Sequence, residues 1–184
     1  MALNVPELRT ERLVLRRWRD DDRAPFAELN ADPEAMRYFP STLDRAASDA
    51  FVDRIEEHFA EHGWGLWAVE VAATGTFAGF VGLWPATFES DFTPAVEIGW
   101  RLRTDHQGLG YATEAALVVS DDGFERLGLD EIVSFTTVTN TPSQSVMRKI
   151  GMTFERQFDH PNVSPDSELC AHVLYRLRAE DRST

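Results

Sequence analysis

The sequence predicts one domain of α+β or α/β class, in which helices cover a mixed β-sheet. Its 184 residues suit a single domain, since domains usually contain ~100–200 residues. No repeat, low-complexity tract or linker divides residues 1–184. Apolar patterns follow one another in the order strand, helices, three strands, helix, strand, helix, two strands. This order predicts about seven strands and about four helices around a mixed sheet.

The first elements are a strand and two helices. Leu13–Trp18 is rich in Leu and Val and alternates weakly, which favours a strand. Asp20–Asp22 place acids where a helix dipole is positive, so a helix should begin there. An amphipathic helix is predicted from Arg45 to His62, ending at Gly63. The apolar residues that recur every four positions in it are Ala47, Phe51, Ile55 and Phe59.

Three strands form the middle of the chain. Leu66–Val71 and Phe77–Leu83 are joined by Ala-Thr-Gly-Thr, which is typical of a hairpin turn. Pro85–Pro94 is expected to be a loop, and Ala95–Leu102 to be the next strand.

A glycine turn at residues 106–112 opens the second half. It leads into a helix that should pass Leu117, Phe124 and Leu127 and close at Gly128. A β-branched strand is expected next, at Ile132–Val138.

The last helix has a clear start signal. Thr141 is expected to cap it, Pro142 suits the first helical position, and Gln144 completes a capping box. Gly151 is placed to end this helix. Two final strands are expected near Phe154 and over Leu169–Leu177.

Charge and composition exclude several partners. The formal net charge is −13, and such a surface repels the phosphates of nucleic acids and of anionic membranes. The one cysteine, Cys170, excludes an intramolecular disulfide and a thiolate metal cluster, and it should be a small buried apolar residue. The first residues lack an apolar signal core, and no run of ~18 apolar residues occurs, so we expect a cytoplasmic protein.

The strongest chemical signal is the strand, glycine turn and helix from Val96 to Leu127. Gly108, Gly110 and Ala112 allow a ligand to approach the backbone closely. The first N–H groups of the helix have no internal partner and form an anion site together with the helix dipole. A turn that merely requires glycine is the alternative. No G-x-x-x-x-G-K-[ST] loop and no early G-x-G-x-x-G turn occurs, which excludes a P-loop and a Rossmann dinucleotide site.

Four motifs in this order resemble the GNAT N-acetyltransferases, and their RimJ/RimL-type branch in particular. Gln107-Gly108-Leu109-Gly110-Tyr111-Ala112 matches the Q/R-x-x-G-x-G/A acetyl-CoA signature. Residues 8–16, the flanks of the turn at 97–100 and 112–115, and the Asn-x-x-Ser and Lys-x-Gly-Met pattern of residues 140–152 resemble that branch. The resemblance covers residues 8–177, nearly the whole chain.

This resemblance implies a fold and a cosubstrate. In the family a mixed, mostly antiparallel sheet splays open between two parallel strands, here 95–102 and 132–138, and acetyl-CoA lies in the splay. The residues that it assigns to the cofactor are Trp100, Leu102 and Arg103 along the pantetheine arm, Gln107, Gly108, Leu109, Gly110, Tyr111 and Ala112 at the pyrophosphate, and Asn140 and Ser143 near the thioester. It implies no metal.

Acetyl transfer to an amine requires positioned reactants, a base, and a group that donates a proton or a hydrogen bond to the leaving thiolate. Glu97 is the candidate base, because it lies on the strand before the turn and points away from the face of Val96 and Ile98. An ordinary exposed strand glutamate is the alternative. Ser143 is the candidate donor to the thiolate. Many family members use a tyrosine in this region, and none occurs between residues 112 and 174. The alternative is that Ser143 only belongs to the first turn of its helix.

The 85–94 loop is the candidate acceptor lip. Phe88 and Phe92 flank two acids, and an aromatic, acidic lip suits a cationic amine. Core packing or a solvated face is the alternative. His58 and His62 have the spacing of helical metal ligands, but no third ligand is indicated and a solvated face is favoured.

We therefore expect an acetyl-CoA-dependent N-acetyltransferase that acts on a primary amine by direct attack in a ternary complex. The acceptor is a protein N-terminal amine or a small-molecule amine. One alternative is an antibiotic- or polyamine-type acetyltransferase, which differs only in its acceptor. Another is a non-catalytic acyl-CoA-binding sensor or interaction module. A homodimer is compatible with the sequence.

Overall fold

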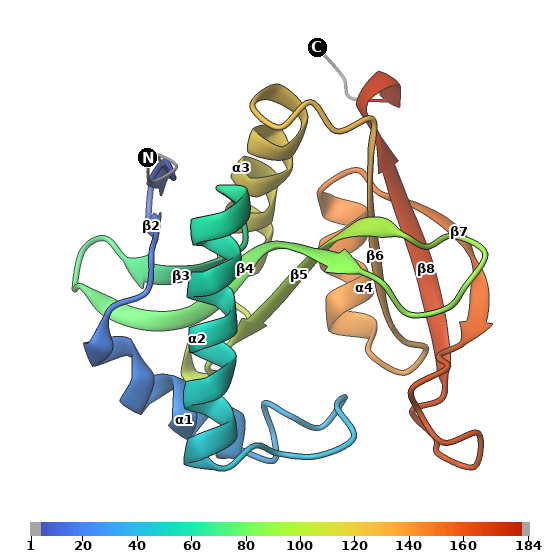
Figure 1. Ribbon diagram of the computed structural model, residues 1–184, viewed down its shortest axis with the longest axis horizontal. Coiled ribbons are helices and arrows are strands. Elements are labelled where there is room, and N and C mark those ends of the chain that lie inside the picture. Colours follow the sequence, from blue (N-terminus) through green and yellow to red (C-terminus); the bar gives the residue numbers. More distant parts are fainter. Residues whose placement is uncertain (1–4, 182–184) are drawn as a thin grey trace.

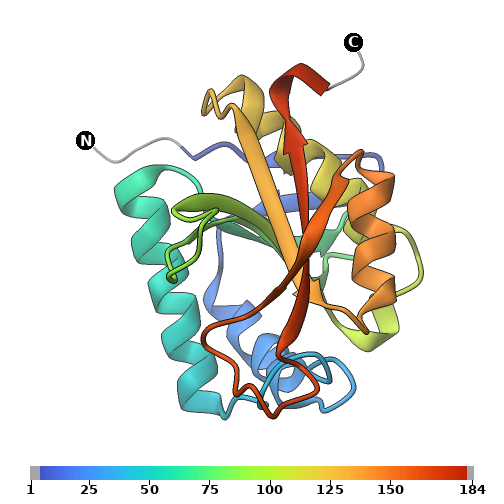
Figure 2. The same ribbon diagram turned by 90° about the vertical axis from the view of Figure 1, so that its right-hand side faces the viewer.

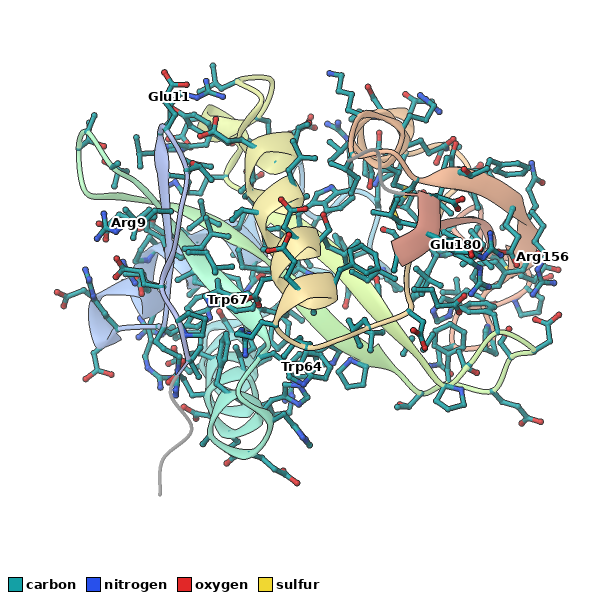
Figure 3. The ribbon with its side chains drawn as sticks, turned by 90° about the horizontal axis from the view of Figure 1, so that it is seen from above. Arg9, Glu11, Trp64, Trp67, Arg156 and Glu180 are labelled. Atoms are coloured by element: carbon teal, nitrogen blue, oxygen red, sulfur yellow. The ribbon has the colours of Figure 1, made fainter. Side chains whose placement is uncertain are left out.

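An eight-stranded sheet runs through the computed structural model, which describes residues 5–181. The strand order is β1-β2-β3-β4-β5-β6-β8-β7, and every neighbouring pair is antiparallel except β5 and β6. Figure 3 shows Arg9 and Glu11 at the β1–β2 side and Arg156 at the opposite, β7 side. The strands are β1 (Leu8–Arg9), β2 (Leu13–Arg16), β3 (Leu66–Val71), β4 (Thr76–Ala86), β5 (Ala95–Leu102), β6 (Glu131–Thr137), β7 (Thr153–Asp159) and β8 (Ala171–Arg178).

Four α-helices cover the two faces of this sheet (Figure 1). They are α1 (Arg23–Ala31), α2 (Arg45–His62), α3 (Tyr111–Glu125) and α4 (Thr141–Lys149). Helix α1 packs against α2 and β4, whereas α3 packs against β4, β5 and α4. Figure 2 shows α2 and α4 on opposite sides of the sheet. Short 3-10 helices occur at Asp20–Asp22, Thr104–His106 and Ala179–Asp181. No helix in the described part of the chain is long and apolar enough to cross a bilayer.

The parallel pair of strands splays open, as the resemblance implies. Between β5 and β6 one register pair forms, Glu97 with Val133. Beyond it, the Ser134 hydroxyl donates to the Ile98 carbonyl oxygen at 2.9 Å. No further β5–β6 backbone pair follows, so the strands diverge toward their carboxyl ends. The predicted mixed sheet with four helices and a splay at this position is confirmed.

Several predicted boundaries differ. The two-residue strand β1 adds an eighth strand, because two residues are too few to show periodicity. The strand predicted at Leu13–Trp18 is β2, and it ends at Arg16. Strand β4 continues to Ala86, since its last residues still pair with β5, and the loop is therefore 87–94. Helix α3 ends at Glu125, and Gly128 turns the chain two residues after Arg126 with a φ of 67°.

Two helix details also differ from the prediction. The cap of α4 is Asn140, whose side chain accepts from the Ser143 N–H at 3.2 Å, and Thr141 is already helical. In α2, Ala47 is exposed, and the buried face is formed by Ser48, Val52, Ile55 and Phe59. Phe51 does not belong to this buried face, and its ring packs against that of Phe80 of β4.

Candidate functional site

A cavity of about 680 Å³ opens where β5 and β6 diverge, within the ~300–1,000 Å³ that small-molecule sites usually occupy. Its walls come from β5, the turn before α3, the end of β6 and the start of α4. Residues 34–40 and parts of 160–169 close one end. These two segments lie at the same end of the sheet in both Figure 1 and Figure 2.

One wall consists largely of backbone from the glycine turn. Gly108 and Gly110 have φ values of 73° and 84°, a region that side chains disfavour. Gly110 is the N-cap of α3, and no side chain caps this helix end. The N–H groups of the first helical turn therefore lack a protein acceptor and lie at the cavity. This wall can hold an anion without a basic side chain.

An ion pair that the sequence analysis missed fixes this turn to β2. Arg12 donates from Nε to Glu114 Oε2 at 2.7 Å and from Nη1 to the Leu109 carbonyl oxygen at 3.0 Å. Glu114 Oε1 accepts from the Arg12 N–H at 2.9 Å and from the Thr10 hydroxyl at 2.5 Å. Arg12 and Glu114 lie in two of the motifs that carry the family resemblance, residues 8–16 and 112–115. This shared membership is the one feature of the sequence that links the two residues.

The facing wall is the start of α4. Asn140 uses both polar atoms within the protein: Oδ1 accepts from the Ser143 N–H, and Nδ2 donates to the Thr136 hydroxyl at 2.8 Å. Ser143 lines the cavity, and its hydroxyl forms no hydrogen bond with residues 5–181. That hydroxyl is free to bind a ligand.

Glu97 lies at the floor of the cavity, on β5. It also lines a smaller adjoining cavity, so the side chain is reached from two sides. Within residues 5–181 its carboxylate accepts no hydrogen bond, and burial raises its pKa from 4.5 to about 8. A carboxylate with a pKa close to neutrality is suited to accept a proton from an amine.

Arg101 lies on the same strand, and the sequence analysis did not single it out. Its Nη1 donates to Asn30 Oδ1 at 2.5 Å. Its Cζ lies 4.1 Å from the ring centre of Phe39 and 5.4 Å from that of Phe80. Its Nε is buried without a hydrogen-bond partner among the described residues, and burial lowers its pKa to about 10. The sequence feature that could have identified Arg101 is its spacing of four residues from Glu97, because strand residues four apart share a face.

Most residues predicted to hold the cofactor lie together. Those that line the main cavity with Glu97 are Trp100, Leu102, Gln107, Gly108, Gly110, Tyr111, Ala112, Asn140 and Ser143. Arg103 and Leu109 are not among its lining residues. Arg103 forms ion pairs with Glu28 and Asp105, and Leu109 is half exposed.

The predicted acceptor lip lies to one side. Phe88 lines the smaller cavity together with Glu97 and His160. Phe92 packs against Phe88, Phe135 and Phe158 and lines neither cavity. Asp91 pairs with Arg156, so the 87–94 loop reaches β7. The contact of Phe88 and Phe92 with an acceptor stays a prediction.

The two candidate metal ligands of α2 pack against each other and against tryptophans. The rings of His58 and His62 are 4.3 Å apart, and His58 lies 4.6 Å from both Trp64 and Trp84. Within residues 5–181 no three His, Cys, Asp or Glu side chains gather as metal ligands would. Cys170 is buried, as predicted.

Comparisons with known proteins agree with this geometry. The family profile "Acetyltransferase (GNAT) domain" matches residues 12–153. The FsC-acetyl coenzyme A-N(2)-transacetylase of Aspergillus fumigatus is 31% identical over 193 aligned residues, which cover 96% of this chain and 77% of that protein.

Solved structures share the fold. An acetyltransferase from Agrobacterium tumefaciens is 27% identical with a TM-score of 0.76, over 97% of each chain. Mycobacterium smegmatis RimJ, solved in complex with CoA-disulfide, has a TM-score of 0.74 at 19% identity, over 94% of this chain and 84% of RimJ.

Proposed function

From the premise that this chain belongs to the GNAT acetyltransferase family, we propose that it transfers the acetyl group of acetyl-CoA to a primary amine by direct attack in a ternary complex. The observation that carries the mechanism is Glu97. Its carboxylate lies at the splay, has no protein hydrogen-bond partner within residues 5–181, and has a pKa raised to about 8 by burial.

The residues on the cofactor side fit acetyl-CoA. The backbone N–H groups of the first turn of α3, residues 111–113, lie at the cavity and suit the pyrophosphate, and the two glycines leave room for its approach. Trp100 and Leu102 on one side, and Asn140 and Ser143 on the other, would flank the pantetheine and thioester. Bound acetyl-CoA supplies an activated acetyl group as its thioester.

The chain's own residues then have three tasks. Glu97 accepts the proton of the acceptor ammonium, directly or through water, which frees the nitrogen lone pair to form the N–C bond. Backbone N–H groups of β5 beyond the single pair with β6 polarise the thioester carbonyl. Ser143 would donate a hydrogen bond to the sulfur as the C–S bond breaks, and the second proton lost by the attacking nitrogen would pass to the leaving thiolate.

We extend the proposal to the branch of the family and to the class of acceptor. The order of the four motifs favours the RimJ/RimL-like branch, and we propose a cytoplasmic location. The acceptor is then a peptide N-terminus or a small-molecule amine.

Ligand-dependent thermal unfolding tests the proposal first. A ligand present at 100 times its Kd that binds only the folded state adds ~2.7 kcal/mol. In a domain of this size each kcal/mol raises Tm by ~2–4 °C. We expect acetyl-CoA to raise Tm by several degrees, and ATP and NAD to leave it unchanged. No shift with acetyl-CoA would refute the proposal.

An amine panel with acetyl-CoA then separates an enzyme from a sensor. Turnover supports the enzyme. A Tm shift without acetylation of peptide or small-molecule amines would instead indicate an acyl-CoA-binding sensor.

A further inference from the structure

We propose that the acceptor is an amine that also carries an anionic oxygen group, a carboxylate or a phosphate, and that Arg101 binds this group. The acceptor role rests on the function proposed above. The anion site itself rests on Arg101 and its surroundings.

Arg101 lacks the partner that an enclosed arginine normally has. Guanidinium groups taken out of water are usually paired with an anion. Its protein contacts within residues 5–181 are one neutral amide, Asn30, and the rings of Phe39 and Phe80. Nη2 donates no hydrogen bond to these residues, and Nε is buried without a partner.

Arg16 shows what a structural arginine looks like in this protein. It is 5% exposed, and its guanidinium pairs with Asp22 at 2.7 Å and with Glu70 at 2.8 Å. These carboxylates help to raise the pKa of Arg16, whereas burial alone lowers that of Arg101 to about 10. Arg101 therefore stays protonated at neutral pH and lacks the anions that Arg16 has.

The position of Arg101 relative to Glu97 defines where an acceptor would lie. Both residues are on one face of β5, four positions apart, which corresponds to ~13 Å between their Cα atoms. Gly99 lies between them. A side chain at Gly99 would meet no atom within 4 Å except Glu97 Oε1, at 3.8 Å. An acceptor can thus lie over Gly99 with its amine at Glu97 and its anion at Arg101.

The surroundings favour a fork-shaped contact with an oxyanion. A guanidinium offers paired N–H donors that match a carboxylate or a phosphate. Phe39, Phe80 and Phe51 line this end of the cavity, and such apolar surroundings strengthen the attraction between charges. Arg37, which also lines the cavity, pairs with Glu34, whereas Arg101 has no ion pair with residues 5–181. The other cation that lines the cavity, Lys149, lies at the C-terminal end of α4 and not on β5.

A purely structural role for Arg101 is the competing explanation. Through Asn30 and Phe39 it connects α1 and the segment after it to β5. That role predicts a loss of stability when Arg101 is replaced, and no preference for anionic amines.

The test measures binding and turnover with matched amines. Full-length protein saturated with CoA, which cannot transfer acetyl, is titrated by calorimetry with ω-amino carboxylates of two to six carbons. Each is matched by an alkylamine and by an aminoalkyl phosphonate of similar length. We expect the anionic amines to bind 10- to 100-fold tighter than the alkylamines, and the preferred length and head group to distinguish carboxylate from phosphate.

Two variants assign the preference to Arg101. R101Q should abolish it, and R101K should retain a part. R54Q is the matched control, because Arg54 also lies over a phenylalanine ring, Phe51, at 5.4 Å but does not line the cavity. An unchanged Tm shift with acetyl-CoA shows that each variant is folded.

The outcomes separate the two proposals. Equal binding of anionic and neutral amines to the wild-type protein would overturn the inference, whether or not R101Q folds. A preference that R101Q retains would also overturn it. Anion-dependent binding without acetylation of any amine would refute the proposed function and leave the anion site standing. Acetylation of alkylamines as efficiently as amino carboxylates would refute the inference alone.

Discussion

The two walls of the cavity are built from different parts of the chain. The cofactor wall is backbone: a turn with two glycines in left-handed conformation, and the uncapped start of α3. The acceptor wall is side chains: Glu97 and Arg101 on β5, with aromatic rings around them. Because its donors belong to the backbone, the cofactor wall would bind the same ligand in any sequence that forms the turn. The proposed acceptor wall changes with every substitution of its side chains, so we expect specificity for the acceptor to reside there.

The largest effect is expected at the acceptor wall. E97Q removes the base and retains the shape, so kcat should fall by ~10²–10⁴-fold, while the Kd for acetyl-CoA stays unchanged. Steady-state kinetics and calorimetry measure the two quantities. E57Q, at an exposed position of α2 that lines neither cavity, is the control. An unchanged kcat in E97Q would exclude Glu97 as the base.

The next effect belongs to the cofactor wall. Gly110 has a φ of 84°, and a Cβ there would lie 3.3 Å from Arg12 Nη2. In G110V a strain of ~1–2 kcal/mol would displace the turn, and we expect the Kd for acetyl-CoA to rise by ~100-fold or more, because several N–H donors move together.

G75V is the matched control for G110V. Gly75 has a φ of 68° in the β3–β4 turn, and nothing lies within 4 Å of its Cβ position. Both variants should lose stability, and G110V alone should lose affinity. If G110V bound acetyl-CoA normally, the phosphate site would lie elsewhere.

A pH profile sharpens the role of Glu97. Because only the deprotonated form is a base, kcat/KM should rise about tenfold per pH unit and level off near the raised pKa, about 8. Protonation of Glu97 in the folded state also means that stability declines from about pH 5 to pH 8, since the unfolded carboxyl has already lost its proton there. The Tm of E97Q minus that of wild type should therefore be larger at pH 9 than at pH 6. A difference independent of pH would contradict the raised pKa.

A smaller effect is expected from the Arg12–Glu114 pair. R12A frees the turn from β2 without changing its backbone, so the Kd for acetyl-CoA should rise by ~3–10-fold, as expected for the loss of a partly exposed charged hydrogen bond. R9A, at the exposed Arg9 nearby, is the control and should bind normally. Equal affinities of R12A and R9A would show that the turn holds its shape alone.

The same contrast explains what the sequence could predict. The glycine turn, its helix and the alternation that places Glu97 are local patterns, and the structure has them where expected. The meeting of Arg101 with Asn30 and Phe39 joins positions 71 and 62 residues apart. Residues 32–44 between α1 and α2 show no periodicity that would announce this contact.

The misplaced details have physical reasons of the same kind. Asn140 and Thr141 are both good capping residues, and the hydrogen bond to Thr136, which belongs to β6, favours Asn140. Gly123 lies within α3, where glycine usually costs ~1 kcal/mol relative to alanine. A Cβ there would come within 3.0 Å of Ile132 Cδ1 and 3.1 Å of Leu83 Cδ1, so glycine is what lets the helix approach the sheet.

The backbone character of the cofactor wall has an evolutionary consequence. Main-chain N–H donors survive almost any side-chain replacement, provided that glycine is kept where φ is positive. Descendants of one ancestral gene can therefore drift far apart in sequence and retain the shared cosubstrate. Natural selection can then vary the few side chains on β5 and in the segment after α1. New acceptor specificities can arise in this way while the cofactor site is retained.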